Sequence, residues 1–284
     1  MKAIIVGSSG FVGKHLQHTL KNMGYSVTGV DKEDSRLIFD EFKELFEGAN
    51  IIINLAGAPI VSRWSKDYKE LLYSSRIDTT ERIIEVIKEL EIKPQLFIST
   101  SAVGIYSNRD VHSEQSLDYA DDFLSKLCQD WENRALDAQD LGVRTAIFRY
   151  GIVLGDDGGA LKQMLPPFKF GVGGVIGSGK QGFSFIHIDD LMSAYKFIIE
   201  NSDSKGIYNL SAPEPTTNRG LTKALGKALH RPTIFPLPEF VLQIIYGEGS
   251  RVLTDGQQMI PQKLLDEGFK FKYKNIDEAV ASLI

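Results

Sequence analysis

The sequence predicts an α/β fold, built on a doubly wound parallel sheet with a smaller mixed lobe toward the C-terminus. Two observations carry this prediction. Short apolar runs alternate with amphipathic stretches over the first 154 residues, as in consecutive strand–helix–strand units. The first apolar run ends in a cluster of glycines that leads straight into a helical pattern, which is typical of a tight strand-to-helix turn.

The strands are expected at the apolar, β-branched runs. KAIIVG at 2–7 ends on a glycine, as a buried parallel strand would, and YSVTGV at 25–30 follows as the second strand. Further strands are expected at 50–57, 95–102 and 144–154.

Helices are expected between these runs. Residues 11–23 carry apolar side chains at roughly helical spacing, and Gly24 stands where a helix C-cap would. Residues 66–90 form a long amphipathic stretch, which we expect to be one helix. Its apolar side chains could serve a homodimer interface, although packing in the core would also account for them.

The motif Gly7-Ser8-Ser9-Gly10-Phe11-Val12-Gly13 lies between the first strand and the first helix. In that position, backbone N–H groups and the helix dipole face a pyrophosphate, so the motif predicts a Rossmann-type dinucleotide site. The alternative is a turn that needs glycine only for its backbone angles, and the strand–turn–helix context argues against it.

The choice between NAD and NADP depends on the end of the second strand. Asp31 follows Gly13 by 18 residues, close to the offset at which a carboxylate accepts hydrogen bonds from an adenosine ribose, and this favours NAD. Lys32 could instead pair with a 2′-phosphate, which would favour NADP. The sequence leaves both cofactors open.

We expect two interleaved parts. Residues 1–154 form the dinucleotide-binding domain, to which residues 186–204 return, and residues 155–185 and 205–284 form a substrate lobe that does not extend the parallel sheet. The glycine-rich segment 155–185 carries Lys162, Lys169 and Lys180, so it is interpreted as a mobile cover over an anionic substrate or as a plain surface loop.

Composition excludes several classes of protein. With a net charge of −5 and scattered Lys and Arg residues, the chain has no basic stripe for nucleic acid or anionic lipid. Cys128 is the single cysteine, which excludes an internal disulfide and a cysteine-built zinc site and fits a reducing compartment, so we expect the cytoplasm. The first apolar run is too short for a signal peptide or a membrane span. A small-molecule substrate is the expected partner.

Several motifs together resemble the extended short-chain dehydrogenase/reductases, which include sugar-nucleotide epimerases and dehydratases. A closer resemblance is to the YfcH-type epimerase-like subfamily and spans nearly the whole chain; some of its members carry the label of a cell-division inhibitor. The motifs that carry the resemblance are the GxxGxxG turn, Asp31, Asn54-Leu55-Ala56-Gly57, Arg63-Trp64, Ser75-Arg76, Ser99-Thr100-Ser101-Ala102-Val103-Gly104, Asp130-Trp131-Glu132, Gly177-Ser178-Gly179, Phe185-Ile186-His187-Ile188-Asp189-Asp190 and the tail from Arg231-Pro232 to Gly268-Phe269.

The resemblance implies a catalytic Tyr and Lys four residues apart on the helix that leads to Glu132, and this chain lacks them. Tyr119 and Lys126 are seven residues apart, about 10 Å along a helix axis. Aligned on Glu132, the Lys position falls on Cys128 and the Tyr position on Leu124, neither of which can transfer a proton at such a site.

Other candidates take their place. Ser101 matches the catalytic Ser of the superfamily, and its alternative role is that of a turn or capping hydroxyl. Tyr106 is the phenol nearest to it in sequence, either as a replacement acid or as a packing residue. Arg149 follows a strand core and could hold a ligand phosphate or a neighbouring carboxylate. His187 is expected to pack beneath the site, with Asp189 as a helix N-cap.

The expected function is that of an NAD(P)-binding short-chain dehydrogenase or epimerase relative that acts on a small polar or sugar-nucleotide-like substrate. The alternative is a non-catalytic protein that senses NAD(P)(H) or serves as a scaffold. The predicted catalytic residues are Ser101 and Tyr106, and the predicted cofactor-binding residues are Gly7, Ser9, Gly10, Phe11, Val12, Gly13, Asp31, Lys32, Leu55, Ala56, Gly57, Arg76, Thr100 and Arg149.

Overall fold

The computed structural model describes residues 1–284 and has at its centre a six-stranded parallel sheet in the order β2-β1-β3-β4-β6-β9. All five neighbouring pairs in this sheet are parallel. The order changes direction between β1 and β3, where open α/β sheets bind their ligands beyond the carboxyl ends of the strands. The strands of this sheet are β1 (Lys2–Val6), β2 (Ser26–Val30), β3 (Ile51–Asn54), β4 (Leu96–Ala102), β6 (Arg144–Tyr150) and β9 (Gly206–Leu210).

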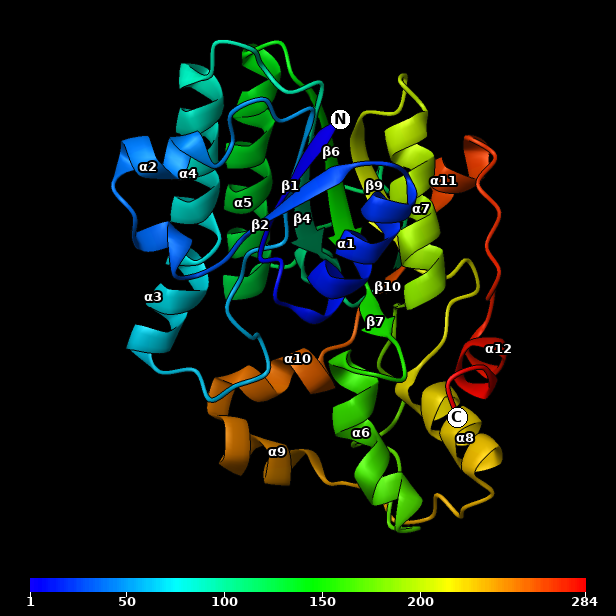
Figure 1. Ribbon diagram of the computed structural model, residues 1–284. Coiled ribbons are helices and arrows are strands. Elements are labelled where there is room, and N and C mark those ends of the chain that lie inside the picture. Colours follow the sequence, from blue (N-terminus) through cyan, green and yellow to red (C-terminus); the bar gives the residue numbers. More distant parts are fainter.

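Helices cover both faces of the sheet (Figure 1). Along β1, Ala3 and Ile5 point into one core while Ile4 and Val6 point into the other, as the alternation of a strand requires. The first core also receives α1 (Phe11–Asn22) and α7 (Ile188–Glu200). The second receives α2 (Phe39–Glu44), α4 (Ile77–Glu89) and α5 (Phe123–Asp140).

A smaller lobe lies beyond the carboxyl ends of the strands, at the bottom of Figure 1. Its core joins β7, α6, β8, α8 and α12. Its elements, with the short pieces around it, are β5 (Val111–His112), β7 (Ile152–Leu154), α6 (Gly159–Lys169), β8 (Phe185–His187), α8 (Asn218–Leu229), α9 (Glu239–Tyr246), α10 (Arg251–Thr254), β10 (Gln258–Met259) and α12 (Ile276–Ala281). The short helix α11 (Gln262–Asp266) packs instead against β9 of the main sheet. None of the helices is long and apolar enough to cross a membrane.

Two expectations about the elements are wrong. The chain from Lys205 onward does not stay outside the parallel sheet, because Gly206–Leu210 pairs with β6 as its edge strand. Residues 66–90 form two helices, α3 (Lys66–Ser74) and α4, separated at Ser75 and Arg76, where the Ser75 hydroxyl accepts a hydrogen bond from the N–H of Ala58. The break places Arg76 at the start of α4, beside the carboxyl edge of the sheet.

Candidate functional site

The glycine turn between β1 and α1 is tightly packed against the loop that follows β3. Gly7 has φ +86°, which favours glycine, and a Cβ atom there would lie 3.0 Å from the carbonyl carbon of Leu55. A Cβ atom on Gly13 would lie 2.5 Å from the carbonyl oxygen of Gly7. Both positions therefore need glycine for reasons internal to the protein.

Gly10 has no such reason. Its backbone is extended, with φ −67° and ψ 168°, and its hypothetical Cβ has a single near neighbour, the Gly7 carbonyl oxygen at 3.4 Å. It precedes α1 without a side-chain cap, and the backbone N–H groups of Phe11, Val12 and Gly13 have no acceptor in the protein. Open space above unpaired N–H groups at a helix N-terminus fits the pyrophosphate of a dinucleotide.

Asp31, at the end of β2, holds the turn in shape. Its carboxylate accepts hydrogen bonds from the Ser8 hydroxyl at 2.8 Å and from the N–H and hydroxyl of Ser9, both at 2.9 Å. Partial desolvation would raise the pKa of Asp31, but these hydrogen bonds outweigh it and lower the pKa below its usual value. Lys32, next to it, is exposed and forms no ion pair.

The loop after β3 continues this edge toward β4. Gly57 is exposed, and a Cβ atom on it would lie 2.9 Å from the guanidinium carbon of Arg76, so Arg76 lies directly on this glycine. Thr100 is buried, and its hydroxyl donates to the carbonyl oxygen of Asn54 at 3.1 Å. We therefore propose that Thr100 ties β4 to β3 and that Gly57 and Arg76 face the ligand.

Ser101 is the end of a buried polar network. Its hydroxyl donates to Glu132 at 2.6 Å, and Arg149 donates to both oxygens of the same carboxylate, at 2.8 and 2.7 Å. Desolvation opposes the charge of Arg149, but the hydrogen bonds and charge of Glu132 prevail and raise its pKa. Because the Ser101 proton points at Glu132, its oxygen is left to accept hydrogen bonds from other groups.

The placement of Arg149 favours one of its two predicted roles. The side chain is 0% exposed, and its remaining hydrogen bonds go to the hydroxyls of Tyr106 at 2.7 Å and Tyr119 at 3.3 Å. Of the two partners that the sequence left open for Arg149, a ligand phosphate or a neighbouring carboxylate, the structure shows the carboxylate, that of Glu132. We propose that Arg149 positions Glu132 and does not bind the cofactor.

Tyr106 is also placed for packing and not for proton transfer. It is 0% exposed, stacks on His112 with ring centroids 4.8 Å apart, and its hydroxyl donates to Asn209 at 2.9 Å. Burial raises the pKa of Tyr106 to about 12, against the opposing effect of Arg149. A catalytic role for Tyr106 finds no support in this geometry, and we propose a positioning role.

Helix α5 carries Leu124 and Cys128, the residues that the resemblance assigns to the Tyr and Lys positions. Leu124 packs near Gly104, with a side-chain carbon 3.6 Å from where a Cβ would stand. Cys128 is buried, and desolvation, reinforced by Glu132, raises the pKa of its thiol to about 12 while Arg76 opposes the rise. At neutral pH the thiol is neutral and a poor nucleophile.

Sequence reasoning missed Glu132 and Asn209 as members of the site. Glu132 served as part of a family motif and to align the helix, although a glutamate on an otherwise apolar helix face is a signal of a buried ion pair. Asn209 lies on β9 and is 0% exposed, and β9 itself was not expected in the sheet. No local pattern could have brought it to Tyr106.

The glycine-rich segment after β7 has a steric role at its start. A Cβ atom on Gly155 or Gly158 would lie 2.6 Å from the Phe11 ring, so these glycines allow close approach to α1. His15 and Asp157 join the same two segments at 3.1 Å. At the N-cap of α7, His187 and not Asp189 accepts the capping hydrogen bond, from the N–H of Asp189 at 3.0 Å.

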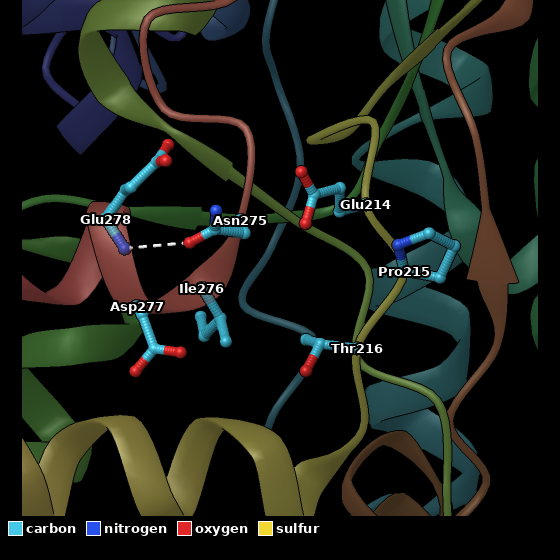
Figure 2. A pocket seen from close by; sticks show the side chains of 7 residues that line it. All are labelled: Glu214, Pro215, Thr216, Asn275, Ile276, Asp277 and Glu278. Atoms are coloured by element: carbon cyan, nitrogen blue, oxygen red, sulfur yellow. Dashed lines mark hydrogen bonds between the residues drawn. The ribbon is translucent and has the colours of Figure 1, made fainter.

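A hollow of about 510 Å³ lies in the smaller lobe (Figure 2). In the figure, Glu214, Pro215 and Thr216 face the first turn of α12 across it, and the N–H of Glu278 donates to Asn275 at 3.0 Å. Its lining includes no residue of the glycine turn or of the Ser101 network. This hollow is therefore separate from the candidate ligand site, which lies at the carboxyl edge of the parallel sheet.

Comparison with known proteins agrees with this geometry. A model of the NAD dependent epimerase/dehydratase family matches residues 3–211, and a model of a domain of unknown function, DUF1731, matches residues 237–283. The chain is 35% identical to the epimerase family protein SDR39U1 homolog, chloroplastic, of Arabidopsis thaliana, over 100% of this chain and 87% of that protein. It is 34% identical to the epimerase family protein YfhF of Bacillus subtilis, over 100% and 98%. The crystal structure of human epimerase family protein SDR39U1 with NADPH has a TM-score of 0.91 at 30% identity, over 100% of this chain and 99% of that one.

Proposed function

Because the chain belongs to the NAD dependent epimerase/dehydratase family, we propose that it is an NAD(P)-dependent oxidoreductase or epimerase acting on a small polar or sugar-nucleotide-like substrate. The observation that carries the proposal is Gly10. Neither its backbone angles nor its neighbours require glycine, so the missing side chain leaves room for a ligand above the free N–H groups of α1.

Different residues along the sheet edge bind different parts of the dinucleotide. The glycine turn binds the pyrophosphate, and Asp31 keeps the turn in its bound shape while facing the adenosine ribose. When bound, the nicotinamide ring accepts and returns hydride. Ser101, at the end of β4, lies on the side away from β2, where the nicotinamide half would lie.

Ser101 orients the substrate through its oxygen. Because its own proton is held by Glu132, its oxygen accepts a hydrogen bond from a substrate hydroxyl beside the reacting one, which fixes the carbinol carbon for hydride removal. The proton of the reacting hydroxyl passes to water, since Tyr106 is fully buried and Cys128 is neutral. Ser101→Ala is expected to lower turnover, whereas Cys128→Ala leaves it within about twofold.

The binding proposal is tested at Gly10. Gly10→Leu should fold with the melting temperature of the wild type, because the backbone accepts any residue there, yet it should lose NADH and NADPH binding measured by titration calorimetry. Gly142→Asn is the control, since Gly142 has φ +76° and nothing within 4 Å of its hypothetical Cβ. Undiminished binding by Gly10→Leu would contradict the proposal.

The chemical proposal is tested with substrates. The freshly purified protein is denatured, released dinucleotide is identified by mass spectrometry, and the protein is then assayed with nucleoside-diphosphate sugars and small hydroxy and carbonyl compounds. We expect interconversion or oxidation of at least one member of the panel. Cofactor binding without turnover across the panel would refute the enzymatic proposal and favour a sensor of NAD(P)(H).

A further inference from the structure

An exposed apolar face lies at the outer end of the smaller lobe. It is formed by six large side chains, each more than half exposed: Phe170, Ile234, Phe235, Phe240, Ile244 and Ile245. None of the six packs against any of the five hydrophobic clusters of the protein. The folding of the chain therefore does not account for them. Single apolar residues on a surface are ordinary, but a group of this size on one face marks an interaction site.

The six side chains come from segments that lie side by side. The N–H of Leu237 donates to the carbonyl oxygen of Val175 at 2.8 Å, and the N–H of Gly177 donates to the carbonyl oxygen of Leu237 at 2.9 Å. Residues 234–238 thus run beside the chain that leaves α6 at Phe170, and they lead directly into α9. In Figure 1, α9 and the lower end of α6 lie along the bottom of the molecule.

Helix α9 presents its part of this face from a fixed position. Phe240 and Ile244 are four residues apart, so they lie on the same side of the helix, whereas Leu242 is 5% exposed on the other. Arg63 of the dinucleotide-binding domain donates to the carbonyl oxygen of Ile244 at 2.8 Å and holds this end of the helix. A face that is already ordered loses little entropy when a partner binds it.

The size of the apolar face fits a stable interface. At about 200 Å² for a fully exposed residue of this size, the six residues offer roughly 700 Å² of largely apolar surface. This is more than the roughly 300–600 Å² of the largest apolar patch on a typical monomer. It comes close to the roughly 800 Å² that each partner buries in an interface of standard size.

The stretch 66–90, whose apolar side chains could also have served a homodimer, is a weaker candidate. Most of its large apolar side chains are buried inside the protein, namely Leu72, Ile77, Ile83, Val86 and Ile87. Packing in the core, which the sequence left as the alternative, accounts for them.

The surroundings of the apolar face favour a second copy of the chain over other partners. Pro236 and Pro238 have no backbone N–H, so they interrupt the hydrogen bonds that an added peptide strand would need. Lys169 and Glu239, one charge of each sign, are exposed beside the face and form no ion pair. Two copies can meet over such mixed charges without a row of like charges. An anionic membrane would instead repel Glu239 and a chain of net charge −5.

We propose that the protein is a homodimer in which the apolar faces of two copies pack against each other across a two-fold axis. The face is self-complementary in the simplest way, because apolar side chains on one copy meet apolar side chains on the other. It contains no residue of the glycine turn or of the Ser101 network, so the inference does not depend on the proposed function.

The experiment measures the assembly of the full chain by sedimentation velocity between about 1 and 100 μM. We expect the wild type to sediment as two chains of 31.6 kDa each. Phe240→Glu and Ile244→Glu each bury a charge in the interface and should raise the dissociation constant at least about 30-fold. Ile92→Glu is the matched control, since Ile92 is 76% exposed but follows α4, away from α9, and this variant should stay dimeric. NADH affinity and the circular dichroism spectrum should be unchanged in all three variants.

Thiol labelling gives an independent readout. Cys128, the single cysteine, is buried, so a cysteine introduced on the surface is the one that reacts. In the dimer, Ile244→Cys should react with a thiol reagent at least about tenfold more slowly than Ile92→Cys, because the interface covers it. Adding Phe240→Glu to Ile244→Cys should abolish this protection.

Three results would overturn the inference. A wild-type protein that stays monomeric at the highest concentration would show that the face does not bind itself. A dimer that persists in both Phe240→Glu and Ile244→Glu would place the interface elsewhere. A monomer that co-sediments with vesicles of phosphatidylcholine and phosphatidylglycerol, and loses this in Ile244→Glu, would assign the face to a membrane surface instead.

Discussion

The carboxylate of Asp31 stands where the adenosine ribose is expected, so its charge should oppose a 2′-phosphate. Asp31→Ala is expected to weaken both cofactors, because the glycine turn loses its hydrogen-bond acceptor, but to raise the ratio of NADPH to NADH affinity about tenfold. Parallel titrations with the two cofactors measure the ratio. Asp34→Ala is the control, since this neighbour accepts from the N–H of Asp31 at 2.7 Å without touching the turn. An unchanged ratio would show that Asp31 acts on the turn alone.

Glu132 is expected to be essential for stability as well as for holding Ser101. Glu132→Gln leaves Arg149 buried with its counter-charge removed, so we expect the free energy of unfolding to fall by about 3 kcal/mol. Urea denaturation measures this loss. Asp137→Asn removes one partner of the half-exposed pair with Arg134 and should cost less than about 1 kcal/mol. Equal losses for the two variants would contradict a buried ion pair.

At the scale of residues, the sequence predicted what local spacing encodes. The glycine turn and Asp31 were predicted from their places at the ends of the first two strands, whereas Ser101 and the absence of the Tyr/Lys pair rest on the family resemblance. The partners of Arg149 and Tyr106 come from α5 and β9, remote in sequence, and no local pattern specifies such contacts.

Among the elements, α7 has an N-cap that depends on pH. Nδ1 of His187 must be unprotonated to accept the N–H of Asp189, and burial lowers the pKa of this histidine. The unfolded chain therefore binds the proton more readily than the folded one, so this contribution to stability is lost as the pH falls below about 6.5. Thermal melts between pH 7.5 and 5 should show a smaller loss in His187→Asn, whose amide caps at any pH. The same pH dependence in both proteins would contradict this account.

Element boundaries were predicted to within one residue where apolar runs are short, as at β1, which is followed by Gly7, and at β2, which ends at Val30. The break between α3 and α4 was missed because the helical spacing continues through it, and the Ser75 side chain that ends α3 bonds to Ala58, in a loop before it. Tertiary contact overrode local periodicity there.

At the scale of the whole molecule, Asn209 joins the sheet to the C-terminal segment. It is 0% exposed, accepts from Tyr106 and donates to the carbonyl oxygen of Ile260 at 3.0 Å. Asn209→Ala removes one partner of the Tyr106 hydroxyl and leaves the carbonyl oxygen of Ile260 without this donor, so we expect a loss of about 2 kcal/mol that shifts the whole unfolding transition. Urea denaturation followed by tryptophan fluorescence and by circular dichroism should give coincident curves. Asn133→Ala, on the exposed side of α5, is the control, and separate transitions would show that the lobe unfolds by itself.

The late arrival of β9 also has a consequence for synthesis on the ribosome. β6 is complete at Tyr150, but its outer edge has no partner until residues 206–210 have been made, and the chain between them builds much of the lobe first. At typical elongation rates the edge waits roughly 3 to 12 seconds with its main-chain groups unpaired. An open strand edge recruits other chains. Slow codons over residues 151–205 should therefore raise the insoluble fraction of newly made protein, whereas the same slowing after residue 211 should not.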